Sequence, residues 1–148
     1  MKIAIGCDHG GYVLKDAVIG CLKKRGIEVI DCGTNSADSV DYPVFGEKVA
    51  RLVAKGECEK GVVMCGTGIG ISIAANKVKG IRCALCHDEY TAKMTAMHNN
   101  SNVLAMGGRV VTPEKAVQIL ENWLDTQFEG GRHIKRVDMF TEIENREE

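Results

Sequence analysis

Residues 61–76 read Gly-Val-Val-Met-Cys-Gly-Thr-Gly-Ile-Gly-Ile-Ser-Ile-Ala-Ala-Asn, and this stretch determines the fold that we expect. The apolar run at residues 61–65 predicts a strand, and the residues from 70 onward predict a helix. Three alternating glycines make the turn between the two elements. A strand joined to a helix in this way is typical of an α/β protein with a parallel sheet.

The same alternation continues on both sides of this unit. Short apolar runs predict further strands at residues 2–7, 27–32, 81–86 and 102–106. Apolar residues at helical spacing predict further helices at residues 12–24, 45–54, 88–98 and 114–124. Gly26, Asp88 and Thr112 stand where helix caps are expected. The sequence therefore predicts an α/β fold with a doubly wound, mostly parallel five-stranded sheet, in a flavodoxin-like or Rossmann-like three-layer sandwich.

All 148 residues fit a single domain, and the chain has no internal repeat, linker or low-complexity segment. The end of the chain is charged, yet four apolar residues recur at helical spacing, namely Ile134, Val137, Phe140 and Ile143. We expect a last helix over about residues 131–145 whose apolar face packs on a partner subunit.

Composition argues against several classes of protein. The formal net charge of −1 argues against a nucleic-acid-binding protein. No apolar run approaches the ~18 residues that span a bilayer, and the first residues lack the pattern of a signal peptide, so we expect a cytoplasmic protein. The seven cysteines are an odd number and are interpreted as thiols of a reducing compartment.

Cys83 and Cys86, followed by His87, match both a haem-attachment pattern and the spacing of redox or zinc pairs. Residues i and i+3 of a strand point to opposite faces of the sheet. If residues 81–86 form a strand, the two sulfurs cannot converge on one group. A thiol redox protein is therefore disfavoured.

Ligands of open α/β sheets bind beyond the carboxyl ends of the strands. Cys65 is the residue of most interest there, because it enters the glycine turn just before a helix. A thiol beside a helix N-terminus ionises more readily than a free thiol, and the backbone amides of such a turn can bind an anion. A base beside such a loop is suited to removing a proton α to a carbonyl. The alternative is a buried cysteine that ends a strand before a tight turn.

The pattern around several other polar residues allows two interpretations each. Asp8 and His9 follow the first strand and could bind a sugar hydroxyl or phosphate, or could form a helix cap beside a surface histidine. Arg132 and Arg136 lie at i and i+4 and could bind phosphate, or could belong to a solvated charged tail. His98 ends a helix, where the dipole alone favours histidine. Because helix ends of this kind lie opposite the strand carboxyl ends, His98 and Cys65 could share a substrate only across two subunits.

Together these residues resemble the ribose-5-phosphate isomerase B family, which includes allose-6-phosphate and galactose-6-phosphate isomerases. The resemblance covers essentially the whole chain. It rests on Gly6-Cys7-Asp8-His9-Gly10-Gly11, Asp41-Tyr42-Pro43, Cys65-Gly66-Thr67-Gly68-Ile69-Gly70-Ile71-Ser72, Ala74-Ala75-Asn76-Lys77, His98-Asn99, Gly108-Arg109-Val110-Val111 and Glu129-Gly130-Gly131-Arg132-His133.

The resemblance implies a cofactor-free sugar-phosphate isomerase without a metal, at least a homodimer and possibly a tetramer, with active sites shared between subunits. It implies that Cys65 moves a proton between C1 and C2 through a cis-enediol, assisted by Thr67. It also implies that His98 opens the sugar ring. The substrate-binding residues it implies are Asp8, His9, Gly66, Thr67, Gly68, Ile69, Gly70, Asn99, Arg109, Arg132 and Arg136. One branch of the family has glycine and glutamate at positions 65 and 71, whereas Cys65 and Ile71 place this chain in the cysteine type.

The predicted reaction is the interconversion of ribose 5-phosphate and ribulose 5-phosphate. A 6-phosphohexose isomerase is the nearest alternative, because it would keep the same mechanism. The width of the pocket and the contacts of Asp8 and Asn99 would decide between the two sugars. A flavodoxin-like binding module without catalysis would explain the glycine turn but not the cysteine.

Overall fold

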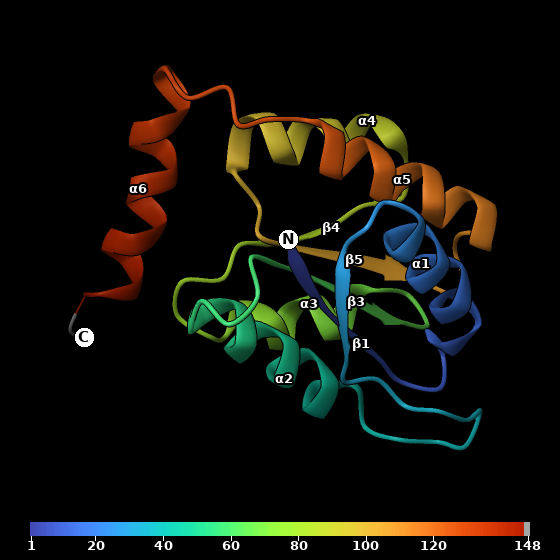
Figure 1. The fold of residues 1–148 in the computed structure, drawn as a ribbon. Coiled ribbons are helices and arrows are strands. Elements are labelled where there is room, and N and C mark those ends of the chain that lie inside the picture. Colours follow the sequence, from blue (N-terminus) through green and yellow to red (C-terminus); the bar gives the residue numbers. More distant parts are fainter. Residues whose placement is uncertain (147–148) are drawn as a thin grey trace.

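The apolar runs assemble into one parallel sheet with helices on both faces (Figure 1). The computed structural model describes residues 1–146. The strands are β1 (Lys2–Cys7), β2 (Glu28–Asp31), β3 (Lys60–Cys65), β4 (Cys83–Leu85) and β5 (Val103–Gly107). The helices are α1 (Tyr12–Lys24), α2 (Tyr42–Ala54), α3 (Ile69–Asn76), α4 (Glu89–Met94), the π-helical turn η1 (Thr95–Asn99), α5 (Pro113–Asp125) and α6 (Arg132–Glu144).

The strand order is β2-β1-β3-β5-β4, and every neighbouring pair is parallel. This arrangement confirms the predicted doubly wound sheet. The chain winds outward from β1 to β2 on one side and continues from β3 on the other, so the order reverses between β1 and β3. Such a reversal point opens a crevice beyond the strand carboxyl ends. Compared with the flavodoxin order, β5 lies inside β4 rather than outside it.

Two apolar cores lie on opposite faces of the sheet. α1 and α5 cover one face, where Leu14, Trp123 and Cys86 are buried. α2 and α3 cover the other, where Val49 and Ile71 are buried and Cys83 packs against the cluster. The two cysteines of the Cys-x-x-Cys spacing therefore face opposite cores, as strand geometry predicts.

Three elements differ most from their predicted bounds. α2 begins at Tyr42, earlier than predicted, because Asp41 occupies the N-cap position and proline lies in the first turn. β4 is shorter than residues 81–86, because the backbone N–H of Arg82 donates to the Asn102 side chain at 2.8 Å. The helix predicted over residues 88–98 is α-helical only to Met94 and then widens into η1.

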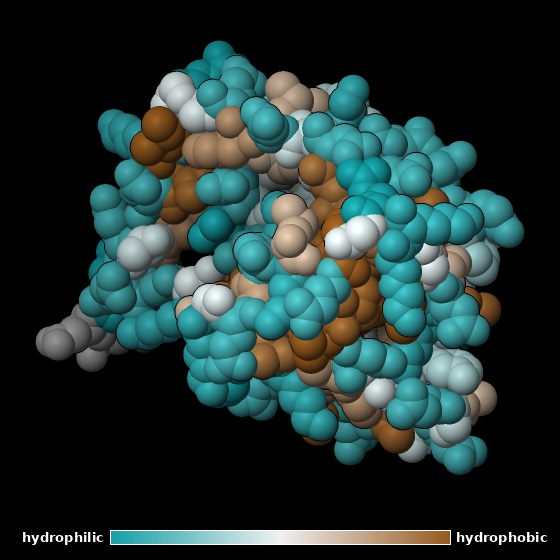
Figure 2. Space-filling model, viewed as in Figure 1, coloured by the Kyte–Doolittle hydropathy of each residue, from teal (hydrophilic) through white to brown (hydrophobic). Residues whose placement is uncertain are grey.

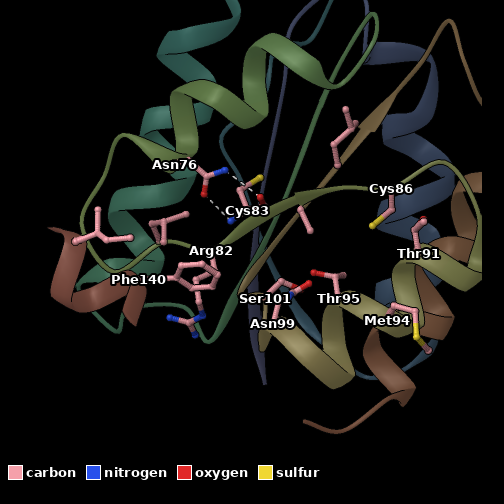
Figure 3. A pocket seen from close by; sticks show the side chains of 14 residues that line it. Asn76, Arg82, Cys83, Cys86, Thr91, Met94, Thr95, Asn99, Ser101 and Phe140 are labelled. Atoms are coloured by element: carbon pink, nitrogen blue, oxygen red, sulfur yellow. Dashed lines mark hydrogen bonds between the residues drawn. The ribbon is translucent and has the colours of Figure 1, made fainter. Parts of the chain in front are cut away.

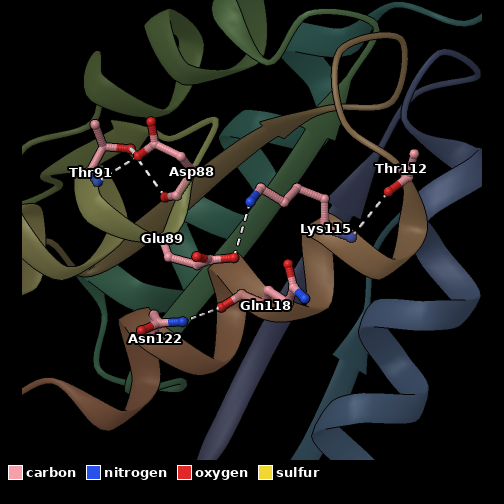
Figure 4. A network of polar contacts seen from close by, with 7 residues as sticks. All are labelled: Asp88, Glu89, Thr91, Thr112, Lys115, Gln118 and Asn122. Atoms are coloured by element: carbon pink, nitrogen blue, oxygen red, sulfur yellow. Dashed lines mark hydrogen bonds and ion pairs between the residues drawn. The ribbon is translucent and has the colours of Figure 1, made fainter.

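Polar contacts fix α4 against α5 (Figure 4). The Asp88 carboxylate accepts from the backbone N–H of Thr91 at 2.7 Å, and the Thr112 hydroxyl accepts from that of Lys115 at 3.2 Å. Both predicted N-caps are thereby confirmed. The Lys115 ammonium also lies 3.0 Å from the Glu89 carboxylate and so joins the two helices. These contacts hold the helix that leads into η1.

α6 stands away from the sheet and meets the rest of the molecule at η1 (Figure 1). Near its other end, the Glu144 carboxylate accepts from the backbone N–H of Gly80 at 3.0 Å. The space-filling view shows a recess between α6, on the left, and the body of the molecule (Figure 2). Ile134, Phe140 and Ile143 on this helix are 51%, 43% and 57% exposed. Within residues 1–146, no helix combines the length and the apolar composition needed to cross a membrane.

Candidate active site

The glycine turn places the Cys65 thiol at the start of a helix. Cys65 ends β3 with only 5% of its surface exposed, and α3 begins at Ile69. The backbone N–H of Gly68 donates to Cys65 Sγ at 3.1 Å. Gly68 itself is left-handed, with φ of 78°, and from it the chain enters α3. A negative charge on this sulfur would be stabilised by the amide and by the helix end.

Thr67 and Gly70 complete the turn. The Thr67 hydroxyl accepts from the backbone N–H of Ile69 at 3.2 Å, so its own O–H is available to donate to a ligand. Thr67 and Ile69 are both exposed. The ring of Tyr42 lies against Gly70, where an added Cβ would come within 2.3 Å of the ring. The turn is thus open to solvent at Thr67 and Ile69 and is covered by the Tyr42 ring at Gly70.

The loops after β1 and β5 pack onto the glycine turn. The N–H of Gly108 donates to the Cys65 carbonyl at 2.8 Å, and the N–H of Arg109 donates to the Gly66 carbonyl at 2.9 Å. A Cβ added to Gly66 would lie 2.8 Å from the Arg109 guanidinium, and one added to Gly10 would lie 2.7 Å from the Gly66 nitrogen. These close approaches bring the exposed Arg109 side chain and the Cys65 thiol to the same surface, at the carboxyl ends of the strands where the order reverses between β1 and β3.

Asp8 and His9, in the loop after β1, border the same surface. The Asp8 carboxylate is buried and accepts from the N–H groups of Gly10 and Gly11 at 2.8 and 3.0 Å. His9 Nδ1 accepts from the backbone N–H of Val40 at 3.2 Å. A neutral imidazole that accepts at Nδ1 carries its proton at Nε2, so His9 presents a donor.

A second polar cluster forms where η1 meets α6. His98 and Asn99 of η1 and Arg136 of α6 line a hollow of about 250 Å³. The rings of His98 and His133 stack with their centroids 4.2 Å apart. Burial and the charge of His98 lower the pKa of His133. Arg132 is exposed in the first turn of α6.

The two clusters lie at opposite ends of the sheet. Cys65 pairs with Gly107 at the end of β5, whereas Asn99 precedes Val103 at its beginning. Four residues of strand separate these ends, which corresponds to roughly 13 Å along the sheet. The structure thus brings together Asp8, His9, residues 65–70 and Arg109, and separately His98, Asn99 and Arg136, with Arg132 on the same helix.

A larger apolar groove of about 680 Å³ runs along the edge strand β4 (Figure 3). Cys83 lines it from β4, Arg82 from just before that strand, Phe140 from α6, and Asn99 from η1. The Asn76 side chain closes one end by bonding the backbone of Cys83 at 2.7 and 2.9 Å. The second polar cluster therefore opens beside an apolar surface.

Three residues that the structure places in these clusters are absent from the predicted site residues. Tyr42 belongs to a quoted motif, but its contact with Gly70 is made between elements far apart in the chain. Glu129 and His133 also belong to a quoted motif, and both lie beside His98. Their common signal is the Gly130-Gly131 pair, which turns the chain back onto η1.

Comparison with known proteins gives consistent matches over the whole chain. Residues 3–140 match a family described as Ribose/Galactose Isomerase. Ribose-5-phosphate isomerase B of Escherichia coli is 52% identical over 98% of this chain and 97% of its own. The structure of Clostridium thermocellum ribose-5-phosphate isomerase B has a TM-score of 0.95 at 58% identity, covering 97% of both chains. That of the Mycoplasma genitalium enzyme with bound ribulose 5-phosphate has a TM-score of 0.95 at 40% identity, covering 99% of this chain and 97% of that one.

Proposed function

This chain belongs to the Ribose/Galactose Isomerase family, and we propose that it is an enzyme that interconverts ribose 5-phosphate and ribulose 5-phosphate. The observation that carries the proposal is the Cys65 thiol held 3.1 Å from a loop amide at the start of α3. A base beside an anion-stabilising loop is what an aldose–ketose isomerisation needs. The activity would place the chain in the pentose phosphate pathway, and we propose a cytoplasmic location.

The proton transfer would take place at the surface that carries Cys65 and Arg109, where the strand order reverses between β1 and β3. The Cys65 thiolate removes the proton from C2 of the open-chain aldose, and the electron pair moves toward the carbonyl oxygen at C1. The amides of residues 66–70 stabilise the enediolate oxygen, and the Thr67 hydroxyl donates to a substrate oxygen. A proton passes from the C2 hydroxyl to the C1 oxygen, and the thiol returns its own proton to C1, which leaves a hydroxyl at C1 and the carbonyl at C2. These steps need no metal or organic cofactor.

Ring opening and phosphate binding require the second cluster. We propose that His98 of a second copy of this chain protonates the ring oxygen as its bond to C1 breaks, while the C1 hydroxyl releases its proton to water and becomes the carbonyl. Asp8 lies nearby, and Asn99 of that copy binds sugar hydroxyls. His9 and Arg109 bind the phosphate from one subunit. The two α6 arginines bind it from the other subunit, and guanidinium groups suit phosphate oxygens well. We assign these roles to two different subunits because the two clusters lie at opposite ends of the sheet within one chain.

A homodimer would supply both halves of the site. Ile134, Phe140 and Ile143 leave an apolar strip exposed beside the β4 groove. Exposed contiguous apolar surface of this kind marks an interface. We propose that the single domain formed by residues 1–148 dimerises through α6 and this groove. Pairs of dimers could form a tetramer through other surfaces.

A 6-phosphohexose isomerase is the second candidate, because the family description names galactose beside ribose. The same thiol and loop would act on C1 and C2 of either sugar. Only the distance between these atoms and the phosphate would differ.

The test is ketose formation from ribose 5-phosphate, with EDTA present, by the wild type, Cys65→Ala and a control variant, Cys58→Ala. Cys58 is a buried thiol, 2% exposed, that packs in the core with α2. Activity in the wild type and Cys58→Ala, with at least about a thousandfold loss in Cys65→Ala, would support the proposal. Turnover of allose or galactose 6-phosphate alone would favour the second candidate. Equal activity of all three proteins would overturn the role of Cys65.

A further inference from the structure

Three potential metal ligands meet where η1 approaches α6. Glu129 Oε2 lies 3.7 Å from His98 Nε2 and 4.0 Å from His133 Nε2. All three ligand atoms lie within 4.8 Å of one another. The backbone N–H of Glu129 donates to the Met97 carbonyl at 3.1 Å, so this segment is tied to η1. The cluster is therefore held together by the backbone.

His133 supplies a second, independent observation. Its side chain is only 5% exposed, and its Nε2 atom is buried. Among the residues that the structure describes, none forms a hydrogen bond with this nitrogen. A buried polar atom without a partner is costly and points to a ligand. The atom is turned toward Glu129, at the centre of the cluster.

We propose that His98, Glu129 and His133 form a binding site for a divalent transition-metal ion of the Zn²⁺ type. Two imidazole nitrogens and one carboxylate oxygen are a common ligand set for zinc, and they leave a coordination position open. Metal–ligand distances of about 2.0–2.2 Å require the three groups to close on the ion. The two rings stack at 15°, so they must also turn until their Nε2 atoms converge. The half-exposed Glu129 side chain can follow.

A metal ion at this site would inhibit isomerisation. A coordinated His98 nitrogen holds the metal with the electron pair that would otherwise carry a proton. The ion would also occupy the space next to Asn99 and Arg136 that we assign to the sugar phosphate. Metal and substrate would then exclude one another. This consequence rests on the proposed function, whereas metal binding itself does not.

Binding is tested by titrating the metal-free protein with Co²⁺ and recording its visible spectrum. The variants are His133→Gln and Glu129→Gln, and the matched control is His87→Gln, which alters an exposed histidine outside the cluster. We expect a spectrum of nitrogen and oxygen ligands in the wild type and control, and affinity weaker by about 10–100-fold or more in both variants. Unchanged affinity in the variants, or a thiolate charge-transfer band, would overturn the site.

Inhibition is tested with Zn²⁺ in the ribose 5-phosphate assay, each protein being compared with its own rate in EDTA. The wild type and His87→Gln should lose activity, recover it with EDTA, and be protected by substrate. Glu129→Gln should need at least about tenfold more Zn²⁺ for half inhibition. Co²⁺ binding to the cluster without inhibition by Zn²⁺ would contradict the inhibitory role and the part proposed for His98. An inactive wild type in EDTA would instead reject the proposed function and leave the binding result standing.

Discussion

At the scale of single residues, the conformation of Gly68 is needed for its backbone N–H to donate to the Cys65 thiol. Its φ of 78° is a conformation that side chains rarely adopt. An added Cβ would also lie 2.5 Å from Leu85 Cδ1 and 2.8 Å from the Met106 carbonyl carbon. The hydrogen bond to Cys65 therefore depends on the absence of a side chain at this position.

Gly68→Ala should lower both stability and activity. Backbone strain and the collision should together cost about 1–3 kcal/mol of unfolding free energy, measured by urea denaturation. Because the amide would move away from Cys65 Sγ, we expect kcat/KM to fall by at least about tenfold.

The control for this substitution is Gly80→Ala. Gly80 has a similar φ of 86° but open space where a Cβ would stand. It should lose about 1 kcal/mol and keep its activity. Wild-type kcat/KM in Gly68→Ala would contradict the role of the turn.

Sequence alone is informative about residues that carry local signals. The position of Cys65 before a glycine turn could be read from the chain, because strand, turn and helix are contiguous there. The contact of Tyr42 with Gly70 and the burial of His133 could not, because each depends on packing between distant segments.

At the scale of elements, the π-helical turn η1 aims His98 and Asn99 at α6. The turn ends at Asn100, which is left-handed with φ of 47°. The Asn100 carbonyl accepts from the Arg82 side chain at 2.8 Å, which anchors the end of the turn to the residue before β4. The sequence predicted one helix here, since a π-turn uses the same residue types as the end of an α-helix. π-turns are frequent at functional sites.

Asn100→Ala should destabilise the protein more than Asn100→Gly. Alanine in the left-handed region costs about 1–2 kcal/mol, whereas glycine adopts it readily. The bond to Arg82 uses the backbone, so both variants retain it. Urea denaturation of the two variants checks this expectation, and equal stabilities would show that the left-handed conformation carries no cost.

At the scale of the whole molecule, regular alternation of strands and helices was enough to predict the parallel sheet and its two helical layers. The exchange of β4 and β5 was not predictable, because the order depends on which edges pair rather than on either strand alone. Nor does the sequence show that α6 stands away from the sheet, since helical spacing indicates an apolar face but not what that face contacts.

Buried thiols should make the fold sensitive to alkaline pH. Burial raises the pKa of Cys86 from its ordinary 9.0 to about 11, and that of Cys7 likewise to about 11. Between these values the unfolded chain releases protons that the folded chain keeps, so stability falls as pH rises above 9.

Removing one of these thiols should weaken that dependence. Between pH 8 and pH 10, the wild type should lose about 1 kcal/mol more than Cys86→Ala. Urea denaturation of both proteins at the two pH values measures this difference. Identical pH dependence would show that Cys86 titrates alike in the folded and unfolded chains.

The separation of the two polar clusters has a consequence for the assembly. If each active site takes Cys65 from one subunit and His98 from the other, two inactive variants can restore one another. Cys65→Ala and His98→Asn homodimers should each be inactive. A mixed dimer would contain one site with both substitutions and one intact site.

The most direct measurement is therefore the isomerase activity of these two variants, co-expressed in equal amounts with different affinity tags. Random pairing makes half of the dimers mixed, with one intact site of two, so activity should return to about a quarter of the wild-type value. Purification through both tags in turn should raise it to about half. Doubly tagged dimers that remain inactive would contradict a site shared between subunits.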